Sequence, residues 1–314
     1  MKLLVTGADG FVGRHLVHRL SQGGHQVVAA CQRGHPAPPP GEAGGALRTI
    51  PLEVTDDASV RAAVEWGPEG IVHLAAVASG REARNDPGRA WSVNAAGTAR
   101  IAAAVASLRE RGRADPVLLL VSTAEVYGAG SPVPRLETDP LRPQSPYAAS
   151  KVGAEVAALE AWRRAGVRAV IARPFPHTGP GQTTQYVVPA FVARLRAAKE
   201  SGADQVPTGN LEPVRDLLDV RDVVGAYLAL LAHGVPGEAY NIARGEGWSL
   251  GDLFRRLAEL MAVPAVAVPD PSLVRSADIA HLVGDATKIR RATGWAPAIT
   301  LEQTLRELVD AEAD

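Results

Sequence analysis

The stretch KLLVTGADGFVG, residues 2–13, decides the fold. Its apolar first half predicts a short strand. Gly7, Gly10 and Gly13 follow at every third position, and an amphipathic helix is expected over residues 11–22. A glycine loop between a strand and a helix exposes backbone N–H groups at the helix amino terminus, where an anion binds. The stretch therefore predicts the first βα unit of a dinucleotide-binding sheet.

Beyond this stretch, short apolar runs alternate with amphipathic ones, which predicts βαβ units and a parallel sheet. The predicted strands are almost entirely apolar, as expected when helices cover both faces of a sheet. They span residues 2–5, 26–30, 47–52, 70–74, 117–121 and 167–172. The predicted helices between them span residues 11–22, 58–65, 94–111 and 146–165.

After residue 172 the alternation breaks, and proline and glycine interrupt the chain. Further helices are expected at 187–199, from about 220, at 248–261 and at 301–310, with one more strand at 239–243. The sequence thus predicts an α/β protein with a Rossmann-like, doubly wound parallel sheet and a smaller, interleaved C-terminal substrate lobe. The predicted dinucleotide-binding domain is 1–172 with a return near 211–243, and the predicted substrate-binding lobe is 173–210 and 244–314.

Composition excludes several classes of function. Lysine and arginine total 33 against 34 acidic residues, so a broad basic surface for nucleic acid is not expected. No apolar run reaches the roughly 18 residues of a membrane span. Cys31 is the single cysteine, which excludes an intrachain disulfide, and the eight histidines show no metal-ligand spacing. A cytoplasmic protein without a metal site is predicted.

Lysine is scarce, with only Lys2, Lys151, Lys199 and Lys288 among the 33 basic residues. Lys151 stands out because it follows Tyr147 by four residues, in SPYAASK at residues 145–151. Pro146 suits the first helical position and Ser145 the cap before it, so the tyrosine and the lysine share one helix face. An ammonium near a phenol lowers a phenol pKa that is ordinarily about 10, which favours proton exchange near neutral pH.

The strand predicted at 117–121 ends in Ser122-Thr123, at the edge where doubly wound sheets place their sites. Together with the glycine spacing and the Tyr-x-x-x-Lys pair, these residues resemble the extended branch of the short-chain dehydrogenase/reductases, the NAD(P)-dependent epimerase/dehydratase family. The resemblance implies that Thr123 hydrogen-bonds the reacting oxygen, Tyr147 is the acid/base, and Lys151 tunes it and holds the nicotinamide ribose. Ser122 is the competing candidate for the role of Thr123.

The resemblance also implies a set of cofactor-binding residues on the loops after the strands. These are Gly7, Gly10, Phe11, Val12, Gly13, Arg33, Glu53, Val54, Leu74, Ala75, Ala76, Tyr147, Lys151 and Pro174. The second strand ends in Cys31-Gln32-Arg33, without the carboxylate that NAD binders place there. Arg33 suits a 2′-phosphate, so NADP(H) is favoured, with NAD(H) as the alternative. His73 is expected to be a packed strand histidine and not a catalyst.

The two residues after Thr123 narrow the reaction. Nucleotide-sugar dehydratases of this family carry an acid pair there, but this chain has Ala124-Glu125. Since alanine cannot act as an acid, a dehydratase of the thymidine-diphosphate-glucose type is disfavoured. Glu125 stays a candidate for catalysis and for substrate binding.

Three segments of the second half, residues 173–182, 209–227 and 284–295, resemble the GDP-4-dehydro-6-deoxy-D-mannose reductases of this family. The resemblance implies 4-keto reduction of a nucleoside-diphosphate sugar, with Arg215 and Arg275 on the nucleotide diphosphate and His177 near the substrate. Pro176 departs from the family, which usually has asparagine there. The alternatives are a 4-epimerase with tightly bound NAD, a reductase of a non-sugar carbonyl, and a non-catalytic NADP-binding sensor or scaffold.

Members of the family usually dimerise through two long helices, here 94–111 and 146–165. A homodimer is therefore expected, with close approach over an alanine-rich surface made by Ala102, Ala103, Ala154, Ala157 and Ala158. The alternative is that these alanines are buried within the monomer.

Overall fold

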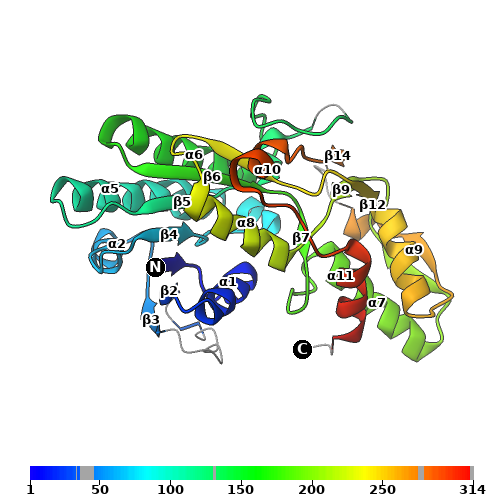
Figure 1. Cartoon of the computed structure of the whole chain (residues 1–314). Helices are drawn as coiled ribbons and strands as arrows, with labels where there is room; N and C mark the ends of the chain where they lie inside the picture. Colours follow the sequence, from blue (N-terminus) through cyan, green and yellow to red (C-terminus); the bar gives the residue numbers. More distant parts are fainter. Residues whose placement is uncertain (33, 36–45, 130–131, 275–278, 312–314) are drawn as a thin grey trace.

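The computed structural model describes residues 1–32, 34–35, 46–129, 132–274 and 279–311. A central parallel sheet is covered by helices on both faces. The helices α7 (Val187–Ser201), α9 (Leu250–Leu260) and α11 (Leu301–Asp310) gather to one side of the sheet (Figure 1). The α/β, doubly wound class predicted from the sequence is confirmed.

The central sheet has seven strands in the order β11-β6-β5-β4-β1-β2-β3, all parallel. The strands are β1 (Lys2–Thr6), β2 (Gln26–Cys31), β3 (Leu47–Pro51), β4 (Gly70–His73), β5 (Val117–Val121), β6 (Arg168–Pro174) and β11 (Ala239–Ile242). Thr6, the last residue of β1, pairs with Ala30 on one side and His73 on the other. The strands thus end together at one edge, and the order reverses beside β1, where such folds bind ligands.

Alternate side chains of each strand build the two halves of the core. Leu3 and Val5 of β1 pack with Leu16 on one face of the sheet, and Leu4 packs with Ile101 on the other. All five are fully buried, and each such side chain contributes about 1.5–3 kcal/mol relative to exposure. Burial on both faces explains the near-continuous apolar strand sequences.

The helices that flank the sheet begin and end much as the sequence predicts. They are α1 (Phe11–Gln22), α2 (Asp57–Val64), α5 (Gly97–Glu110), α6 (Pro146–Ala165) and α8 (Val220–His233). Ser145 caps α6, its hydroxyl accepting the N–H of Ala148, and Pro146 takes the first position. Gly166 ends α6 in the left-handed conformation, at φ 65°, which glycine adopts without strain.

The helix predicted at 94–111 is in fact composite. The helices α3 (Gly80–Asn85) and α4 (Pro87–Trp91) lead into a π-helical turn, Ser92–Ala96, which continues as α5. Asn94 explains the turn, because its amide accepts the Val77 N–H at 2.8 Å and donates to the Val77 carbonyl at 3.2 Å. This long-range contact overrides local helix preference, and hydrophobic periodicity does not reveal it.

The C-terminal part has its own core, built on α7, α9 and α11. It also has small sheets, whose strands are β7 (His177–Thr178), β8 (Gln205–Thr208), β9 (Val214–Asp216), β10 (Leu218–Asp219), β12 (Gly247–Ser249), β13 (Val266–Pro269) and β14 (His281–Leu282). Most of these strands, and α10 (Thr287–Thr293), were not predicted, since two to four residues give no readable alternation. The helix predicted from Trp248 begins later because Trp248 pairs with Arg215 in β12 and β9.

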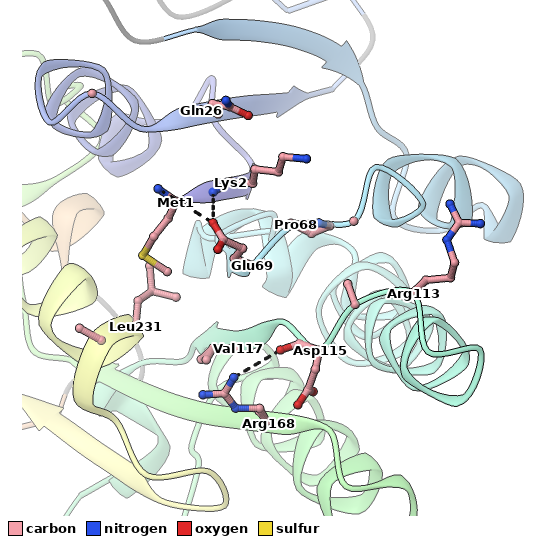
Figure 2. A pocket seen from close by; sticks show the side chains of 14 residues that line it. Met1, Lys2, Gln26, Pro68, Glu69, Arg113, Asp115, Val117, Arg168 and Leu231 are labelled. Atoms are coloured by element: carbon pink, nitrogen blue, oxygen red, sulfur yellow. Dashed lines mark hydrogen bonds and ion pairs between the residues drawn. The ribbon is translucent and has the colours of Figure 1, made fainter.

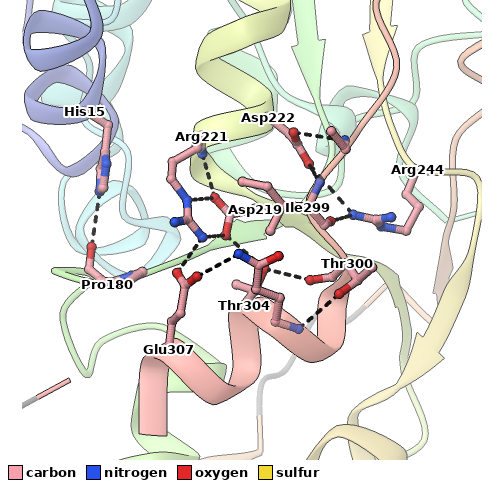
Figure 3. Close-up of polar contacts among 12 residues, drawn as sticks. His15, Pro180, Asp219, Arg221, Asp222, Arg244, Ile299, Thr300, Thr304 and Glu307 are labelled. Atoms are coloured by element: carbon pink, nitrogen blue, oxygen red, sulfur yellow. Dashed lines mark hydrogen bonds and ion pairs between the residues drawn. The ribbon is translucent and has the colours of Figure 1, made fainter. Parts of the chain in front are cut away.

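Polar contacts around the buried Asp219 join α11 to the start of α8 (Figure 3). Asp219, at the start of α8, accepts two hydrogen bonds from the Arg221 guanidinium at 2.8 and 2.7 Å, and a third from Thr304 of α11 at 2.9 Å. On the other side, His15 of α1 contacts the Pro180 carbonyl at 3.1 Å. The loop after β6 and helix α11 are thereby fixed beside the carboxyl edge.

A cavity of about 870 Å³ lies at the opposite edge of the sheet. Its lining includes Lys2, Glu69, Val117 and Arg168, which stand at the amino ends of the strands (Figure 2). The Glu69 carboxylate accepts the backbone N–H of Lys2 at 2.6 Å. Because doubly wound sheets bind ligands at the carboxyl edge, this cavity is not the candidate site.

The alanines expected at a dimer contact divide into two groups. Ala102, Ala154 and Ala158 are buried in the monomer core, so for these three the expectation was wrong. Their small side chains let α5 and α6 pack closely on each other and on the sheet. Ala103 is exposed and Ala157 partly so.

In the part of the chain that the structure describes, no helix has the length and apolarity needed to cross a membrane.

Candidate active site

The glycine loop is close-packed against the end of β4. Gly7 has φ +67°, and a Cβ there would lie 2.8 Å from the Ala75 nitrogen. A Cβ on Gly13 would lie 2.3 Å from the Gly7 oxygen. Gly10 caps α1 without a side chain, which leaves the first N–H groups of the helix for an anion. The loop therefore fits a dinucleotide pyrophosphate.

The other residues predicted to line the cofactor surround this loop. Leu74, Ala75 and Ala76 follow β4, and the Ala75 N–H donates to the Thr6 hydroxyl at 3.1 Å. Val54 is buried, and Glu53 is exposed with its carboxylate accepting the N–H of Thr55 at 3.0 Å. The remaining predicted contacts are Pro174, which ends β6, and Phe11 and Val12, which begin α1. Arg33 lies outside the described residues.

A carboxylate that the sequence patterns did not indicate lies beside the end of β2. Asp9, in the glycine loop, contacts Cys31, where burial first and the Asp9 carboxylate second raise the pKa of the thiol. Its Oδ2 lies 2.6 Å from His35 Nδ1. An acid thus lies beside the end of the second strand, where NAD binders place a carboxylate, but it comes from the loop and not from the strand. The Gly-Ala-Asp-Gly sequence was the signal.

Thr123, Tyr147 and Lys151 come together where β5 meets the first turns of α6. The Thr123 side chain hydrogen-bonds Tyr147. The Lys151 ammonium donates to the Val121 carbonyl, the last of β5, at 2.8 Å. Lys151 is buried with 4% of its surface exposed, so its long chain is fixed by packing. The structure therefore places the three predicted residues in one cluster.

The pKa of Tyr147 is raised, and the expected lowering by Lys151 is not seen. Burial is the largest cause, and the nearby Glu125 carboxylate adds to it, while the Thr123 hydrogen bond opposes them. Desolvation disfavours a phenolate more than a neutral phenol. Tyr147 therefore stays protonated at neutral pH, which is the state that a proton donor needs.

The pKa of Lys151 is lowered to about 8, because burial disfavours the ammonium. At pH 7 most of the lysine is still charged. The same ammonium lowers the pKa of His73, in addition to the larger effect of burial, to about 3. His73 is held between Thr6 at 2.8 Å and Thr98 at 3.2 Å, as expected of a packed strand histidine.

Ser122 and Glu125, which lie before and after Thr123 in the chain, have different surroundings. Ser122, the competing candidate, is buried and donates its hydroxyl to Glu155 at 2.5 Å. Glu125 lies in the short 3-10 turn Ala124–Tyr127, close enough to affect Tyr147. The geometry thus favours Thr123 over Ser122 as the hydroxyl at the reacting oxygen.

Asn94 is a second residue that sequence reasoning did not single out. Beyond its contacts with Val77, it donates to the Ser150 hydroxyl at 2.9 Å, and Ser150 donates to the Tyr147 carbonyl at 2.7 Å. Asn94 thus supports the turn of α6 that carries the tyrosine. The π-helical turn around it, which sequence patterns do not show, is the structural signal.

Two of the predicted substrate residues, His177 and Arg215, lie in β7 and β9 of the small sheets. His177 stacks on Phe11, the first residue of α1, with ring centroids 6.4 Å apart, and burial lowers the pKa of His177. Arg215 lies in β9 and donates to the Ile279 carbonyl at 2.6 Å. Pro176 offers only its carbonyl, which accepts the Leu218 N–H at 2.9 Å. Arg275 lies outside the described residues.

Among the described residues, no three or more histidine, cysteine or acidic side chains are grouped to hold a metal ion.

Comparisons with known proteins agree with this geometry. Residues 3–243 match the model of the NAD dependent epimerase/dehydratase family. The chain is 33% identical to GDP-6-deoxy-D-mannose reductase of Pseudomonas aeruginosa, over 98% of this chain and 96% of that protein. It is 30% identical to a UDP-glucose 4-epimerase of Mycolicibacterium smegmatis, over 99% and 98%. The solved structure of RMD from Pseudomonas aeruginosa complexed with NADPH matches with a TM-score of 0.82 and 31% identity, over 99% of this chain and 98% of that one.

Proposed function

Because the chain belongs to the NAD dependent epimerase/dehydratase family, we propose that it is an NAD(P)-dependent oxidoreductase acting at C4 of a nucleoside-diphosphate sugar. The proposed reaction is reduction of a 4-keto group on a GDP-6-deoxyhexose. The observation that carries the proposal is the cluster of Thr123, Tyr147 and Lys151 at the edge that bears the glycine loop. A binding protein has no need for these three side chains together.

A nicotinamide cofactor bound at the glycine loop would supply the hydride. Tyr147 donates a proton to the oxygen at C4, and its raised pKa keeps the phenol protonated until that transfer. The Thr123 hydroxyl hydrogen-bonds the same oxygen and orients it. The Lys151 ammonium is proposed to hold the nicotinamide ribose, and the Val121 carbonyl fixes its position. Glu125 lies within electrostatic reach of Tyr147 and is proposed to contact the sugar.

GDP is proposed as the nucleotide because the P. aeruginosa reductase acts on a GDP sugar and matches over nearly the whole chain. Arg215 and Arg275 are proposed to hold the diphosphate, and His177 to line the substrate side. Pro176 lacks an amide side chain and a backbone donor. The sugar is therefore expected to be held differently from the sugars of family members that have asparagine there.

For the cofactor we propose NADP(H). Arg33 suits a 2′-phosphate, and His35 Nδ1 lies 2.6 Å from Asp9 Oδ2, so this carboxylate already has a partner in the protein. Removing the negative charge should then favour NADPH further: in Asp9→Asn, we expect the Kd ratio of NADPH to NADH to fall by roughly threefold. Asp115→Asn, at the amino edge of the sheet, is the matched control. An unchanged ratio in Asp9→Asn would contradict a role of Asp9 in cofactor choice.

We further propose a cytoplasmic homodimer whose dinucleotide-binding domain is 1–172 with the return near 211–243, and whose substrate lobe is 173–210 and 244–314. In support, Trp91 and Val156 are 46% and 60% exposed on α4 and α6, beside α5. Exposed large apolar side chains on neighbouring helices are typical of a subunit contact.

The experiment begins by identifying any cofactor that copurifies. NADPH and NADH are then each mixed with 4-keto-6-deoxyhexoses carrying GDP, UDP or dTDP, and loss of the reduced cofactor is followed by absorbance. We expect stoichiometric NADPH oxidation, fastest with the GDP sugar. Tightly held NAD with interconversion of UDP-glucose and UDP-galactose would identify an epimerase instead. Oxidation with simple aromatic ketones alone would exclude a nucleotide sugar.

A further inference from the structure

Glu155 is a buried carboxylate behind the catalytic residues, with 2% of its surface exposed. It accepts the Ser122 hydroxyl at 2.5 Å and two hydrogen bonds from the Arg173 guanidinium, at 3.0 and 2.7 Å. Ser122, Arg173 and Glu155 come from the end of β5, from β6 and from α6. One carboxylate thus joins three elements of the site.

The hydrogen bond between Ser122 and Glu155 affects the site because of the residues next to Ser122 in the chain. It stands between Val121, whose carbonyl binds the Lys151 ammonium, and Thr123, whose side chain hydrogen-bonds Tyr147. Glu155 follows Lys151 by one helical turn. The end of β5 is therefore fastened to α6 at two successive residues, by Lys151 at the first and by Glu155 at the second.

Further hydrogen bonds hold the Arg173 guanidinium in place, which restricts movement of the Glu155 carboxylate bound to it. Its Nη1 donates to the Tyr127 hydroxyl at 3.0 Å and to the Glu137 carbonyl at 3.2 Å. Tyr127 in turn donates to the Asn241 side chain at 2.6 Å. A buried ion pair seldom adds net stability over packed apolar residues of similar volume. Its better-supported value is to fix an arrangement, which here is that of the catalytic strand end.

We propose that Glu155 is a positioning residue: through Ser122 it sets the place of Thr123, and its negative charge stabilises the buried Lys151 ammonium one helical turn away. The proposal rests on the proposed function for its kinetic part only.

The charge of Glu155 matters because it opposes the effect of burial on the pKa of Lys151. The charged or titratable groups that interact with it are Glu155 from α6 and His73 from β4, and His73 stays neutral with a pKa of about 3. Burial lowers the pKa of Lys151 to about 8, and the Glu155 carboxylate works against that lowering. Without the carboxylate, the ammonium would be lost at a lower pH.

Because the chain has only four lysines, the pKa of Lys151 can be measured without any substrate. With lysine labelled by carbon-13 at Cε, the four side chains give few NMR signals, and a Lys151→Arg variant assigns the one of interest. We expect the Lys151 signal of Glu155→Gln to titrate about one pH unit lower than in the unaltered protein. Asp222→Asn is the control, because Asp222 is also buried and hydrogen-bonded, but to the Ala298 and Ile299 N–H groups.

Ser122→Ala separates position from charge and leaves the Glu155–Arg173 pair in place. We expect its kcat to fall roughly tenfold or more, with the Kd for the cofactor and the Lys151 titration unchanged. A folded Glu155→Gln protein with an unshifted Lys151 signal would overturn the charge role, and an unaltered kcat in Ser122→Ala would overturn the positional role. If Glu155→Gln does not fold, the kcat of Ser122→Ala decides. If no nucleotide sugar is turned over, the proposed function fails while the titration still tests Glu155.

Discussion

Tyr147 shows how one side chain is prepared for proton donation. Burial and Glu125 raise its pKa, while Thr123 holds the hydroxyl in place. The sequence places Lys151 on the same helix face as Tyr147, although the lysine charge is not among the causes that shift the Tyr147 pKa. It does not predict the direction of the pKa shift, since burial depends on side chains from other elements, such as Val77 and Ala90.

The first prediction concerns the Tyr147 hydroxyl. In Tyr147→Phe, kcat should fall by about 10²–10⁴, because the proton donor is lost, while the Kd for the cofactor stays within about twofold. Absorbance assays of cofactor oxidation measure kcat, and calorimetry measures the Kd for the cofactor. Tyr240→Phe is the control, since the Tyr240 hydroxyl is also buried but accepts the Val235 N–H. Near-normal kcat in Tyr147→Phe would refute its assignment as the acid.

At the scale of elements, the glycine loop depends on close backbone approach. In Gly7→Ala, a Cβ 2.8 Å from the Ala75 nitrogen forces the loop away from β4. We expect cofactor affinity to fall roughly a hundredfold, equal to about 3 kcal/mol. Titration of the protein with NADPH, followed by fluorescence, measures the change.

Gly112→Ala is the matched control. Gly112 also has a positive φ, of +63°, but a Cβ there meets no other described atom within 4 Å. Both variants carry the same backbone strain, and only Gly7→Ala adds the crowding. Equal losses of cofactor affinity in the two would show that strain, and not the shape of the loop, accounts for the effect.

The buried histidine of β4 makes the sheet sensitive to acid. His73 has a pKa of about 3 when folded, against 6.5 ordinarily, so below pH 6.5 the unfolded chain binds a proton that the folded chain does not. The free energy of unfolding from this group is full above pH 6.5 and declines as pH falls towards 3, by up to about 1.4 kcal/mol per unit.

Thermal unfolding between pH 7 and pH 5 tests this. His73→Gln should lose less Tm over that interval than the unaltered protein does. His18→Gln, on the exposed face of α1, should behave like the unaltered protein. If all three lose the same Tm, His73 is not the source of acid sensitivity.

For the whole molecule, the proposed dimer has a direct test. Val156→Glu places a charge on the exposed surface of α6 and should shift the protein to monomer at micromolar concentration. Val266→Glu, on β13 of the C-terminal part, is the control because Val266 is similarly exposed at 66%. Sedimentation equilibrium measures the mass. A monomeric unaltered protein would refute the dimer.

The sequence predicts the parts of this molecule that depend on contacts between residues close together in the chain. The strand, glycine loop and helix of residues 2–13 are local, and so is the Ser145 cap, and both were predicted correctly. Asp9 beside Cys31 and Asn94 beside Val77 depend on how distant segments meet. No local sequence pattern indicates these contacts. Asp9 and Asn94 could therefore be assigned to the site only from the fold.

The central claim is hydride transfer to C4 of a nucleotide sugar. NADPH carrying deuterium at nicotinamide C4, on the side that is transferred, should be incubated with the protein and GDP-4-keto-6-deoxy-D-mannose. The product is then examined by NMR. The account predicts one deuterium at sugar C4, at a rate abolished in Tyr147→Phe. Product without deuterium at C4, or cofactor that is never oxidised by any 4-keto nucleotide sugar, would contradict it.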